Sequence, residues 1–327
     1  MVMVSDDIGR LRQALRGALV GSEFEPQTEA LLAAAEPYVL LESFEPEMTA
    51  DEQAFYLRER EASRAGDAAR KIDQDRLDAA ERTLPLGATR FGFVPDLPPG
   101  MAWPTVEGKK LLFFAQIDFS AMPRWEGSPL PADGWLYVFI FFPPKPTKDR
   151  PFRTVVLHHR GAREALLRAA QPPADEVWTE TPRDPGTYQL LVLTGRLGIS
   201  VDPARLPQGL SRLAGELEAI CIDLRPLGLE SPRDWQWCGQ LLGQIMVVDG
   251  SPLSIVKGLI EHGADAAAQQ VAQEPGAPGE DWICLLSIHD GAGTFEWSGA
   301  GALYLLIRRR DLAAEDFSRV CMTICGS

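Results

Sequence analysis

Two segments that lie far apart in this chain of 327 residues are nearly the same, and this duplication constrains the fold more than any other feature. The segment 134–140 reads Gly-Trp-Leu-Tyr-Val-Phe-Ile, and the segment 301–307 reads Gly-Ala-Leu-Tyr-Leu-Leu-Ile. Each follows an earlier apolar run that ends near an acidic residue. Short apolar runs bounded by glycine and polar residues are typical of buried β-strands. We therefore expect a β unit of two strands that occurs twice.

Helices are expected at the N-terminal end of the chain. A segment that begins at Ser5 places its isoleucine and leucines at three- and four-residue spacing to about Val20, which predicts an amphipathic helix. The segments 29–36 and 51–84 are rich in alanine and charged residues, and they also favour helix, with the first one ending before a proline. We therefore expect an N-terminal helical region over residues 1–84, packed on the rest of the chain.

The composition changes at Pro85, where prolines and aromatic residues become frequent. Proline breaks regular helices, and the apolar runs that follow are short and separated by turn residues, which indicates strands. The segment 264–279 is low in bulky side chains and offers little area to bury, so we expect a flexible insertion there. The fold class is thus predicted as mainly β (α+β), with peripheral helices and an internally duplicated β core over 85–327. Its repeats lie at about 111–142 and 283–307.

The charge of the chain restricts its partners. The formal net charge is −14 and the pI is near 4.8. Nucleic-acid binding depends mainly on Lys and Arg side chains that neutralise phosphates, so we expect no nucleic-acid partner. A negative field speeds encounter with a basic protein or a cationic ligand, although an acidic surface can also serve solubility alone. If the chain has a protein partner, we therefore expect that partner to be basic.

Cysteine usage and hydropathy point to the cytoplasm. No apolar run reaches the ~18 residues of a membrane span, and no secretory signal is recognisable, so we expect no membrane partner. The cysteines are odd in number and lie in apolar contexts, which is typical of reduced core thiols rather than of disulfides. They are Cys221, Cys238, Cys284, Cys321 and Cys325.

The sequence lacks the motifs of common catalytic and cofactor sites. Its four histidines show no His-x-x-x-His spacing, which argues against a zinc-protease site. Patterns of the Gly-x-Ser-x-Gly, Gly-x-x-x-x-Gly-Lys-Ser/Thr and Gly-x-Gly-x-x-Gly type are also absent. Cys321 and Cys325 would share one strand face near His289, but two small buried core residues explain that spacing more simply. We expect no metal, no cofactor and no catalytic residue.

Two aspartates and two tryptophans occupy similar places in the two repeats. Asp118 and Asp290 end the first apolar run of each repeat, and Trp125 and Trp297 lie in the connectors that follow. Two carboxylates roughly 5–10 Å apart can act as an acid–base pair, whereas an aspartate at a strand end more often caps a turn. The tryptophans either fill the fold or line a cleft between the repeats. These four residues are the candidate ligand- or partner-binding site.

Several motifs together are similar to those of a known family. Residues 91–98 read Phe-Gly-Phe-Val-Pro-Asp-Leu-Pro, and a Trp-Pro pair at 103–104, the apolar run 111–118 and a Gly-x-Leu-Tyr strand follow. Over about residues 85–326 the chain resembles the YwqG-like family of bacterial proteins of unknown function. The resemblance implies a mainly β fold, an internally duplicated core and no established activity. Members are found near bacterial toxin genes, so the resemblance implies an immunity-type or other interaction role, with a basic toxin or effector as the partner.

The repeats differ at two polar positions. The YwqG-like pattern has Gln and Asp where this chain has Ser287 and His289, so a site in the first repeat need not recur in the second. The leading hypothesis is a non-enzymatic, cytosolic bacterial protein-interaction module of immunity or adaptor type. The alternative is a small-molecule-binding protein or hydrolase that uses a cleft between the repeats, with Asp118 near its centre.

Overall fold

A computed structural model of the chain describes eleven stretches of the sequence, and the account below is confined to them. They are residues 5–44, 83–92, 94–141, 153–170, 172–173, 176–177, 190–201, 206, 235–243, 282–289 and 302–325.

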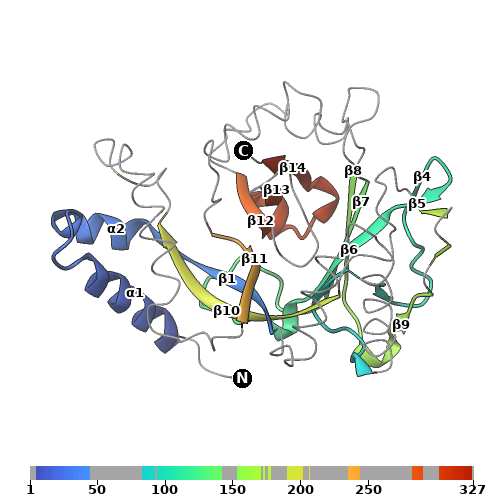
Figure 1. Cartoon of the computed structure of the whole chain (residues 1–327), viewed down its shortest axis with the longest axis horizontal. Helices are drawn as coiled ribbons and strands as arrows, with labels where there is room; N and C mark the ends of the chain where they lie inside the picture. Colours follow the sequence, from blue (N-terminus) through green and yellow to red (C-terminus); the bar gives the residue numbers. More distant parts are fainter. Residues whose placement is uncertain are drawn as a thin grey trace, which may run out of the picture.

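One antiparallel sheet of ten strands dominates the molecule, which confirms the mainly β fold class (Figure 1). Its strands are β1 (Ala35–Phe44), β2 (Arg90–Phe91), β6 (Leu112–Asp118), β7 (Trp135–Phe141), β8 (Arg153–His159), β10 (Leu191–Val201), β11 (Trp235–Leu241), β12 (Trp282–His289), β13 (Ala302–Arg308) and β14 (Cys321–Cys325). Their order across the sheet is β14-β13-β12-β11-β1-β10-β2-β6-β7-β8. The sheet curves until its two edge strands, β8 and β14, contact each other.

The duplication predicted from the sequence is present in the strand pairing. The pairs β6–β7 and β12–β13 are both antiparallel, and each contains a β-bulge at the same place, after Phe113 in the first and after Cys284 in the second. The residue that follows the neighbouring strand donates its backbone N–H to the carbonyl at each bulge. The donors are Gly92 in the first repeat and Leu242 in the second, and both residues have positive φ, of 70° and 63°.

The ten strands divide into two halves of five with the same order. From its edge inward, the first half runs β8-β7-β6-β2-β10, and the second runs β14-β13-β12-β11-β1. Strands β1 and β10 pair antiparallel along nine residue pairs, from Ala35↔Val201 to Ser43↔Leu193, and this pairing joins the halves. The fifth strand of the first half follows its other four in sequence, whereas the fifth strand of the second half comes from the N-terminal end of the chain.

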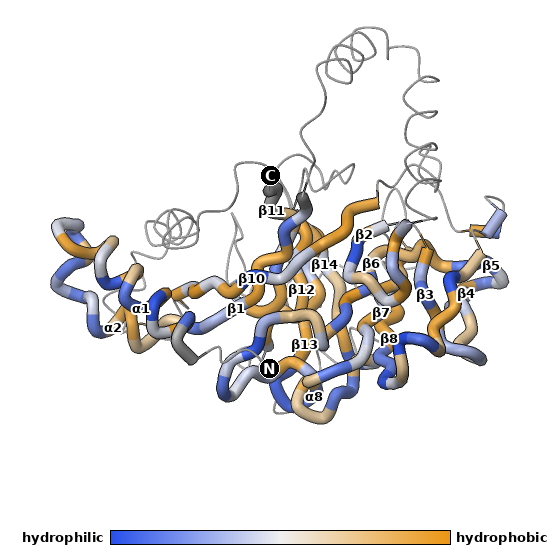
Figure 2. Tube along the Cα trace, turned by 90° about the horizontal axis from the view of Figure 1, so that it is seen from below, coloured by the Kyte–Doolittle hydropathy of each residue, from blue (hydrophilic) through white to orange (hydrophobic). Residues whose placement is uncertain are grey.

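The inward faces of both repeats form one hydrophobic core. Side chains alternate along a strand, so Leu136 and Val138 of β7 point inward while Tyr137 points outward. Leu303 and Leu305 of β13 belong to the same core as Leu136 and Val138. Strands of both repeats are coloured as hydrophobic over most of their length (Figure 2).

The outward face of the first repeat carries a second layer. Two small sheets lie outside the large one: β3 (Asp96–Leu97) pairs with β9 (Leu167–Arg168), and β4 (Thr105–Val106) pairs with β5 (Lys109–Lys110). Side chains from this layer pack on the outward aromatic residues of β7 in a separate apolar cluster.

The described helices are few and lie around the sheet. They are α1 (Ser5–Leu19), α2 (Thr28–Ala34) and α8 (Arg309–Ala313), with single 3-10 turns at η1 (Glu25–Gln27), η3 (Phe119–Ala121), η4 (Arg163–Ala165) and η10 (Phe317–Arg319). In the cartoon and in the Cα tube, α1 and α2 occupy one end of the molecule, beside the ends of β1 and β10 (Figures 1 and 2). Among these helices, none has the length and apolar character that crossing a bilayer requires.

One expected element differs from the structure. A helix was predicted over 29–36, but α2 ends at Ala34 and the chain continues as β1, a central strand. The physical reason is the run of apolar residues from Tyr38 to Leu41, all of which are buried between β10 and β11. Most of the helix expected over 51–84 and the whole insertion at 264–279 lie outside the described residues, and the boundary after residue 84 stays a prediction.

Candidate functional site

Asp118 lies at the end of β6, where its carboxylate holds several segments together. The side chain is 1% exposed, and one of its oxygens accepts hydrogen bonds from the backbone N–H of Ser120 at 3.0 Å and from the Ser120 hydroxyl at 2.6 Å. The other oxygen forms an ion pair with the guanidinium of Arg163. The backbone N–H of Asp118 donates to the Thr89 hydroxyl at 2.9 Å. Asp118 therefore caps η3, which is the strand-end role of an aspartate.

Arg163 covers Asp118 from the solvent side. Its guanidinium also donates to the carbonyl of Leu86 at 3.0 Å and lies 5.8 Å from the centre of the Trp135 ring, within the range of a cation–π contact. These contacts thus connect the end of β6 with η4 and with the segment before β2. They involve Asp118, Arg163 and Trp135. Since both carboxylate oxygens of Asp118 already have cationic or hydrogen-bonding partners, the group is poorly placed to abstract a proton from a substrate.

Of the other three candidate residues, only Trp125 lies within the described part of the chain. Trp125 is half-buried and packs against the core that both repeats share. Asp290 and Trp297 lie outside the described residues, so the four-residue site stays a prediction. The strand register adds one fact: Asp118 pairs with Trp135, and His289 pairs with Ala302 at the equivalent position. The positional equivalent of Asp118 is therefore His289, and Asp290 follows one residue later.

A buried polar network that sequence reasoning missed centres on Asp96 of β3. The side chains of Arg90 and Asp96 are fully buried and form a salt bridge at 2.9 Å, while Arg168 reaches the second carboxylate oxygen of Asp96, also at 2.9 Å. The backbone N–H of Gly87 donates to the Asp96 carboxylate at 2.8 Å. Gln116 accepts from the backbone N–H of Asp96 at 2.8 Å.

The charges around Asp96 decide its ionisation. Burial by itself raises the pKa of this carboxyl, but the positive charges of Arg90 and Arg168 and the hydrogen bonds that they donate outweigh burial and hold the pKa below its usual value. The Tyr137 hydroxyl donates to the backbone carbonyl of Asp96 at 2.7 Å, and burial raises the pKa of Tyr137. The network therefore fastens the outer layer to β2, β6 and β7.

The sequence does contain a signal for this network. It is an arginine within an apolar aromatic segment, followed six residues later by an aspartate between prolines.

A comparison with protein families gives one match. The model of the family described as "Domain of unknown function (DUF1963)" matches residues 89–185 and 245–325, which together make up more than half of the chain. The chain belongs to the DUF1963 family. No curated protein matches it. The matched segments contain both repeats, including Asp96 and Asp118, and leave out α1, α2 and β1.

In this DUF1963 protein a second polar cluster lies where the two edge strands of the sheet approach each other. His158 of β8 faces Glu315 across a distance of 3.4 Å, and Arg160 forms ion pairs with Glu315 at 2.5 Å and with Asp133 at 3.0 Å. The His158 ring packs edge-on against Phe317 of η10, with ring centres 5.1 Å apart. Burial lowers the pKa of His158, although the carbonyl of Asp133 and the charge of Glu315 act in the opposite direction.

The ligands of a metal site do not gather in the described residues of the DUF1963 protein. Within those residues no three His, Cys, Asp or Glu side chains converge as a metal ion requires. Three of the cysteines, Cys238, Cys284 and Cys321, are buried and form no disulfide, and burial raises the pKa of Cys284 to about 12. A thiol with such a pKa is protonated at neutral pH and is therefore a poor nucleophile and metal ligand.

Proposed function

We propose that this DUF1963 protein is a non-enzymatic, cytosolic bacterial protein-interaction module of the YwqG-like kind, acting as an immunity or adaptor protein toward a basic partner. The observation that carries the proposal is the state of Asp118. This residue is the natural centre of a catalytic alternative, yet its carboxylate is buried, caps η3 and pairs with Arg163. These interactions are typical of a residue that stabilises the fold.

The distribution of charge supports a basic partner. The described residues hold nearly equal numbers of basic and acidic side chains, whereas the whole chain has 32 Lys and Arg against 46 Asp and Glu. Several of the described acidic groups are paired, as in Lys110–Glu176 at 2.9 Å and Arg160–Asp133 at 3.0 Å. The excess of acidic residues therefore belongs to the remaining segments of the chain, such as 45–82. An excess of negative charge accelerates association with a basic protein.

Affinity purification from a bacterial host, followed by mass spectrometry, tests the proposal. We expect a basic protein to be retained at about 0.05 M salt and to be lost at about 0.5 M salt, because screening at the higher ionic strength shortens the range of charge interactions to a few ångströms. A chain that retains no specific protein at low salt would contradict the proposal.

The variant Asp118→Asn separates the proposal from the catalytic alternative. An amide at this position loses the ion pair with Arg163 while keeping an acceptor for Ser120, so we expect the free energy of unfolding to fall by about 1 kcal/mol. Retention of the partner should be unchanged. A substrate conversion by the wild type that disappears in a well-folded Asp118→Asn protein would instead establish the hydrolase.

A further inference from the structure

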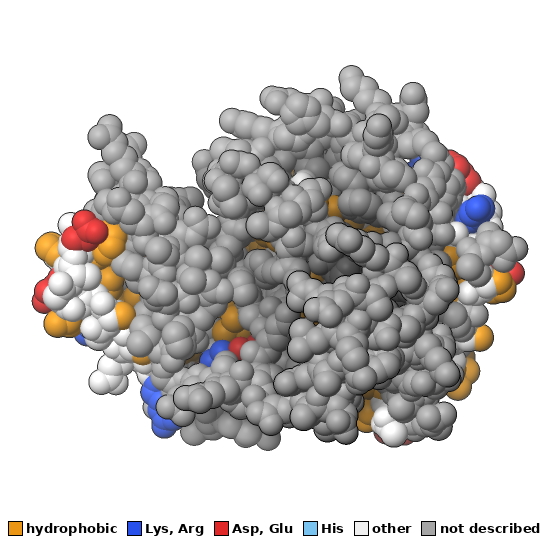
Figure 3. All heavy atoms as spheres, in the orientation of Figure 1, with side chains coloured by type: hydrophobic (Ala, Val, Ile, Leu, Met, Phe, Trp, Pro, Cys, Tyr) orange, Lys and Arg blue, Asp and Glu red, His pale blue; other side chains and the backbone are white. Residues whose placement is uncertain are grey.

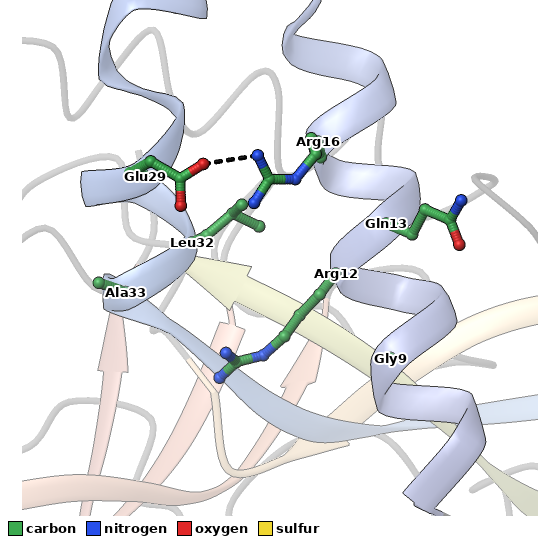
Figure 4. A pocket seen from close by; sticks show the side chains of 7 residues that line it. All are labelled: Gly9, Arg12, Gln13, Arg16, Glu29, Leu32 and Ala33. Atoms are coloured by element: carbon green, nitrogen blue, oxygen red, sulfur yellow. Dashed lines mark hydrogen bonds and ion pairs between the residues drawn. The ribbon is translucent and has the colours of Figure 1, made fainter.

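A groove of about 420 Å³ lies between α1 and α2 (Figure 4), at the end of the molecule away from both repeats (Figure 1). This volume falls within the range of small-molecule sites. Arg12 and Arg16 are one helical turn apart on α1 and both point toward α2 (Figure 4). Glu29 and the apolar Leu32 line the facing side. The described side chains of this end reach the surface in the space-filling view (Figure 3).

The two arginines are unequally engaged. Arg16 forms an ion pair with Glu29 at 2.5 Å, whereas the hydrogen bond of the Arg12 guanidinium goes to the backbone carbonyl of Ala35 at 3.5 Å, the long limit for such a bond. A guanidinium presents five N–H donors in a planar fork. Arg12 therefore has donors to spare on the side that faces the groove.

The pair of Arg16 and Glu29 does not close the groove. Their side chains are 53% and 78% exposed, and ion pairs with that exposure contribute at most about 1 kcal/mol to stability. An incoming anion can therefore share Arg16 at little cost. A Cβ added at Gly9 would meet no atom of the described residues within 4 Å, so those residues leave the groove open beside Gly9.

The charges in the groove select the anion. Arg12, Arg16 and Glu29 together carry a formal charge of +1. A carboxylate matches both this charge and the planar fork of Arg12, which can bind it through two parallel hydrogen bonds. A carboxylate of charge −1 neutralises the groove, whereas a phosphate group, with a charge of about −1.5 to −2, would leave it with a net negative charge. Leu32, which also lines the groove, offers an apolar contact to the ligand carbon next to the carboxylate.

We propose that the α1–α2 groove binds a carboxylate, either of a small organic acid or of the C-terminus of a polypeptide, with Arg12 as its main contact and Arg16 as the second. The groove is formed by residues 9–33, which lie outside the segments that the family model matches, and its proposed ligand does not depend on a basic partner. The two proposals can thus fail independently.

Titration of the full-length protein, followed by the amide signals of α1 and α2 in NMR spectra, tests the site. The probes are N-acetyl-leucine, its uncharged amide N-acetyl-leucinamide, and inorganic phosphate. We expect N-acetyl-leucine to shift the signals of Gly9 and Leu32, and the amide to leave them in place. A response to the amide that equals the response to the acid would overturn the proposal, and so would tighter binding of phosphate than of the acid.

Three variants assign the contact. Arg12→Gln should weaken binding of N-acetyl-leucine about tenfold or more, because it removes a charged hydrogen-bonding group. Arg10→Gln is the matched control: the side chain lies on the same helix outside the groove, 4.0 Å from Asp7, and binding should be unchanged. Glu29→Gln should tighten binding several-fold, a result that loss of folding cannot imitate. Equal affinities for Arg12→Gln and the wild type would refute the assignment.

A pair of peptides distinguishes the two sources of the carboxylate. An acetylated tetrapeptide that ends in leucine is compared with the same peptide bearing a C-terminal amide. Tighter binding of the free-acid peptide than of N-acetyl-leucine identifies a polypeptide C-terminus as the ligand class, and equal or weaker binding identifies a small organic acid.

Discussion

Arg90 and Asp96 show how a single buried ion pair can fix a local fold. Both side chains are fully excluded from solvent, so each has given up its hydration, and the loss is offset only by the partner and by the surrounding hydrogen bonds. Arg90 also donates to the carbonyls of Val94 and Ala88, which closes the short turn between β2 and β3. The arrangement works only with every member present.

Asp96→Asn should therefore be strongly destabilising. The variant leaves Arg90 as a buried charge without its counter-ion, and we expect the free energy of unfolding to fall by about 3–5 kcal/mol. Glu176→Gln is the matched control, because the Lys110–Glu176 pair is partly exposed and its loss should cost less than about 1 kcal/mol. Urea denaturation of the three proteins measures both values, and equal losses in the two variants would contradict the role given to Asp96.

The pair of Arg90 and Asp96 should also make the free energy of unfolding depend on pH in the acidic range. The pKa of Asp96 is lower in the folded state than in the unfolded chain, so its contribution is complete above the unfolded value of about 4 and is lost as the pH falls through the lower folded value. In Asp96→Asn that part of the acid dependence should be missing. The check is the urea midpoint of both proteins measured from about pH 6 to about pH 3, where parallel curves would argue against the assignment.

Tyr137 is a structural residue by its contacts. It is fully buried, and its hydroxyl donates to the Asp96 carbonyl. Tyr137→Phe should lower the free energy of unfolding by about 1 kcal/mol, because the carbonyl loses a donor while the ring packing remains. Partner retention in the affinity experiment should be unchanged. Lost retention with unchanged stability would move the functional surface onto β7.

Some residue-level features were readable in the sequence and others were not. The capping role of Asp118 follows from an aspartate at the end of an apolar run, a local pattern. The Asp96 network could not be derived in the same way, because its members Arg90, Asp96, Gln116 and Arg168 come together only through the pairing of β2 with β6 and of β3 with β9. Charged residues in loops are usually solvated, so composition alone gives no reason to bury these.

At the scale of elements, the contact between the sheet's two edges depends on a short 3-10 turn. Phe317 of η10 is 3% exposed and lies against His158 of β8 and Phe119 of η3, with ring centres 5.1 Å and 6.3 Å away. A residue of the second five-stranded half thus covers part of the edge strand of the first half. An exposed edge strand is prone to pairing with other chains, and covering it in this way protects the fold.

His158 makes this contact sensitive to pH. Burial lowers its pKa in the folded state against the pull of Glu315 and the Asp133 carbonyl, and Arg160 lowers it further. The unfolded chain then binds more protons near the ordinary pKa of about 6.5, so stability is complete above that pH and falls as the pH decreases from it.

The variant His158→Gln should lose this dependence. We expect its urea midpoint to change less between about pH 7 and about pH 5 than that of the wild type. His159→Gln is the control, since the next residue along β8 points to the opposite face. A wild-type midpoint that is flat over this range, or that rises as the pH decreases, would be inconsistent with a neutral buried His158.

The sequence predicted some elements well and missed others, among them β1 and β11. The strands β6, β7, β12 and β13 were visible because each is an apolar run of strand length with a matching copy elsewhere. Strand β1 was missed because its apolar run directly follows a helical segment and contains a proline, Pro37, near its start. Its partners, β10 and β11, lie more than 140 residues away in sequence, and no local pattern indicates them.

At the scale of the whole molecule, the two five-stranded halves have the same order but a different connection. In the first half the chain passes from β8 to β10, the strand next to β2. In the second half the strand next to β11 is β1, which precedes all the others in sequence. The duplicated motifs of the sequence implied equivalent strand pairs, but they gave no indication that the N-terminal segment completes the second half.

This connectivity predicts that the chain order can be changed without loss of the fold. A circular permutant that is opened between β10 and β11, and in which a flexible linker joins residue 327 to residue 1, makes each half continuous in sequence. Strands β10 and β11 are not neighbours in the sheet, so the cut separates no pair of adjacent strands. Changes in loop length cost little free energy, and we expect the free energy of unfolding to stay within about 2 kcal/mol of the wild-type value. Urea denaturation followed by circular dichroism measures this difference. A folded permutant that unfolds in two separate transitions would show that the halves are independent domains. A permutant that does not fold would show that the fold requires the natural connection between β10 and β11.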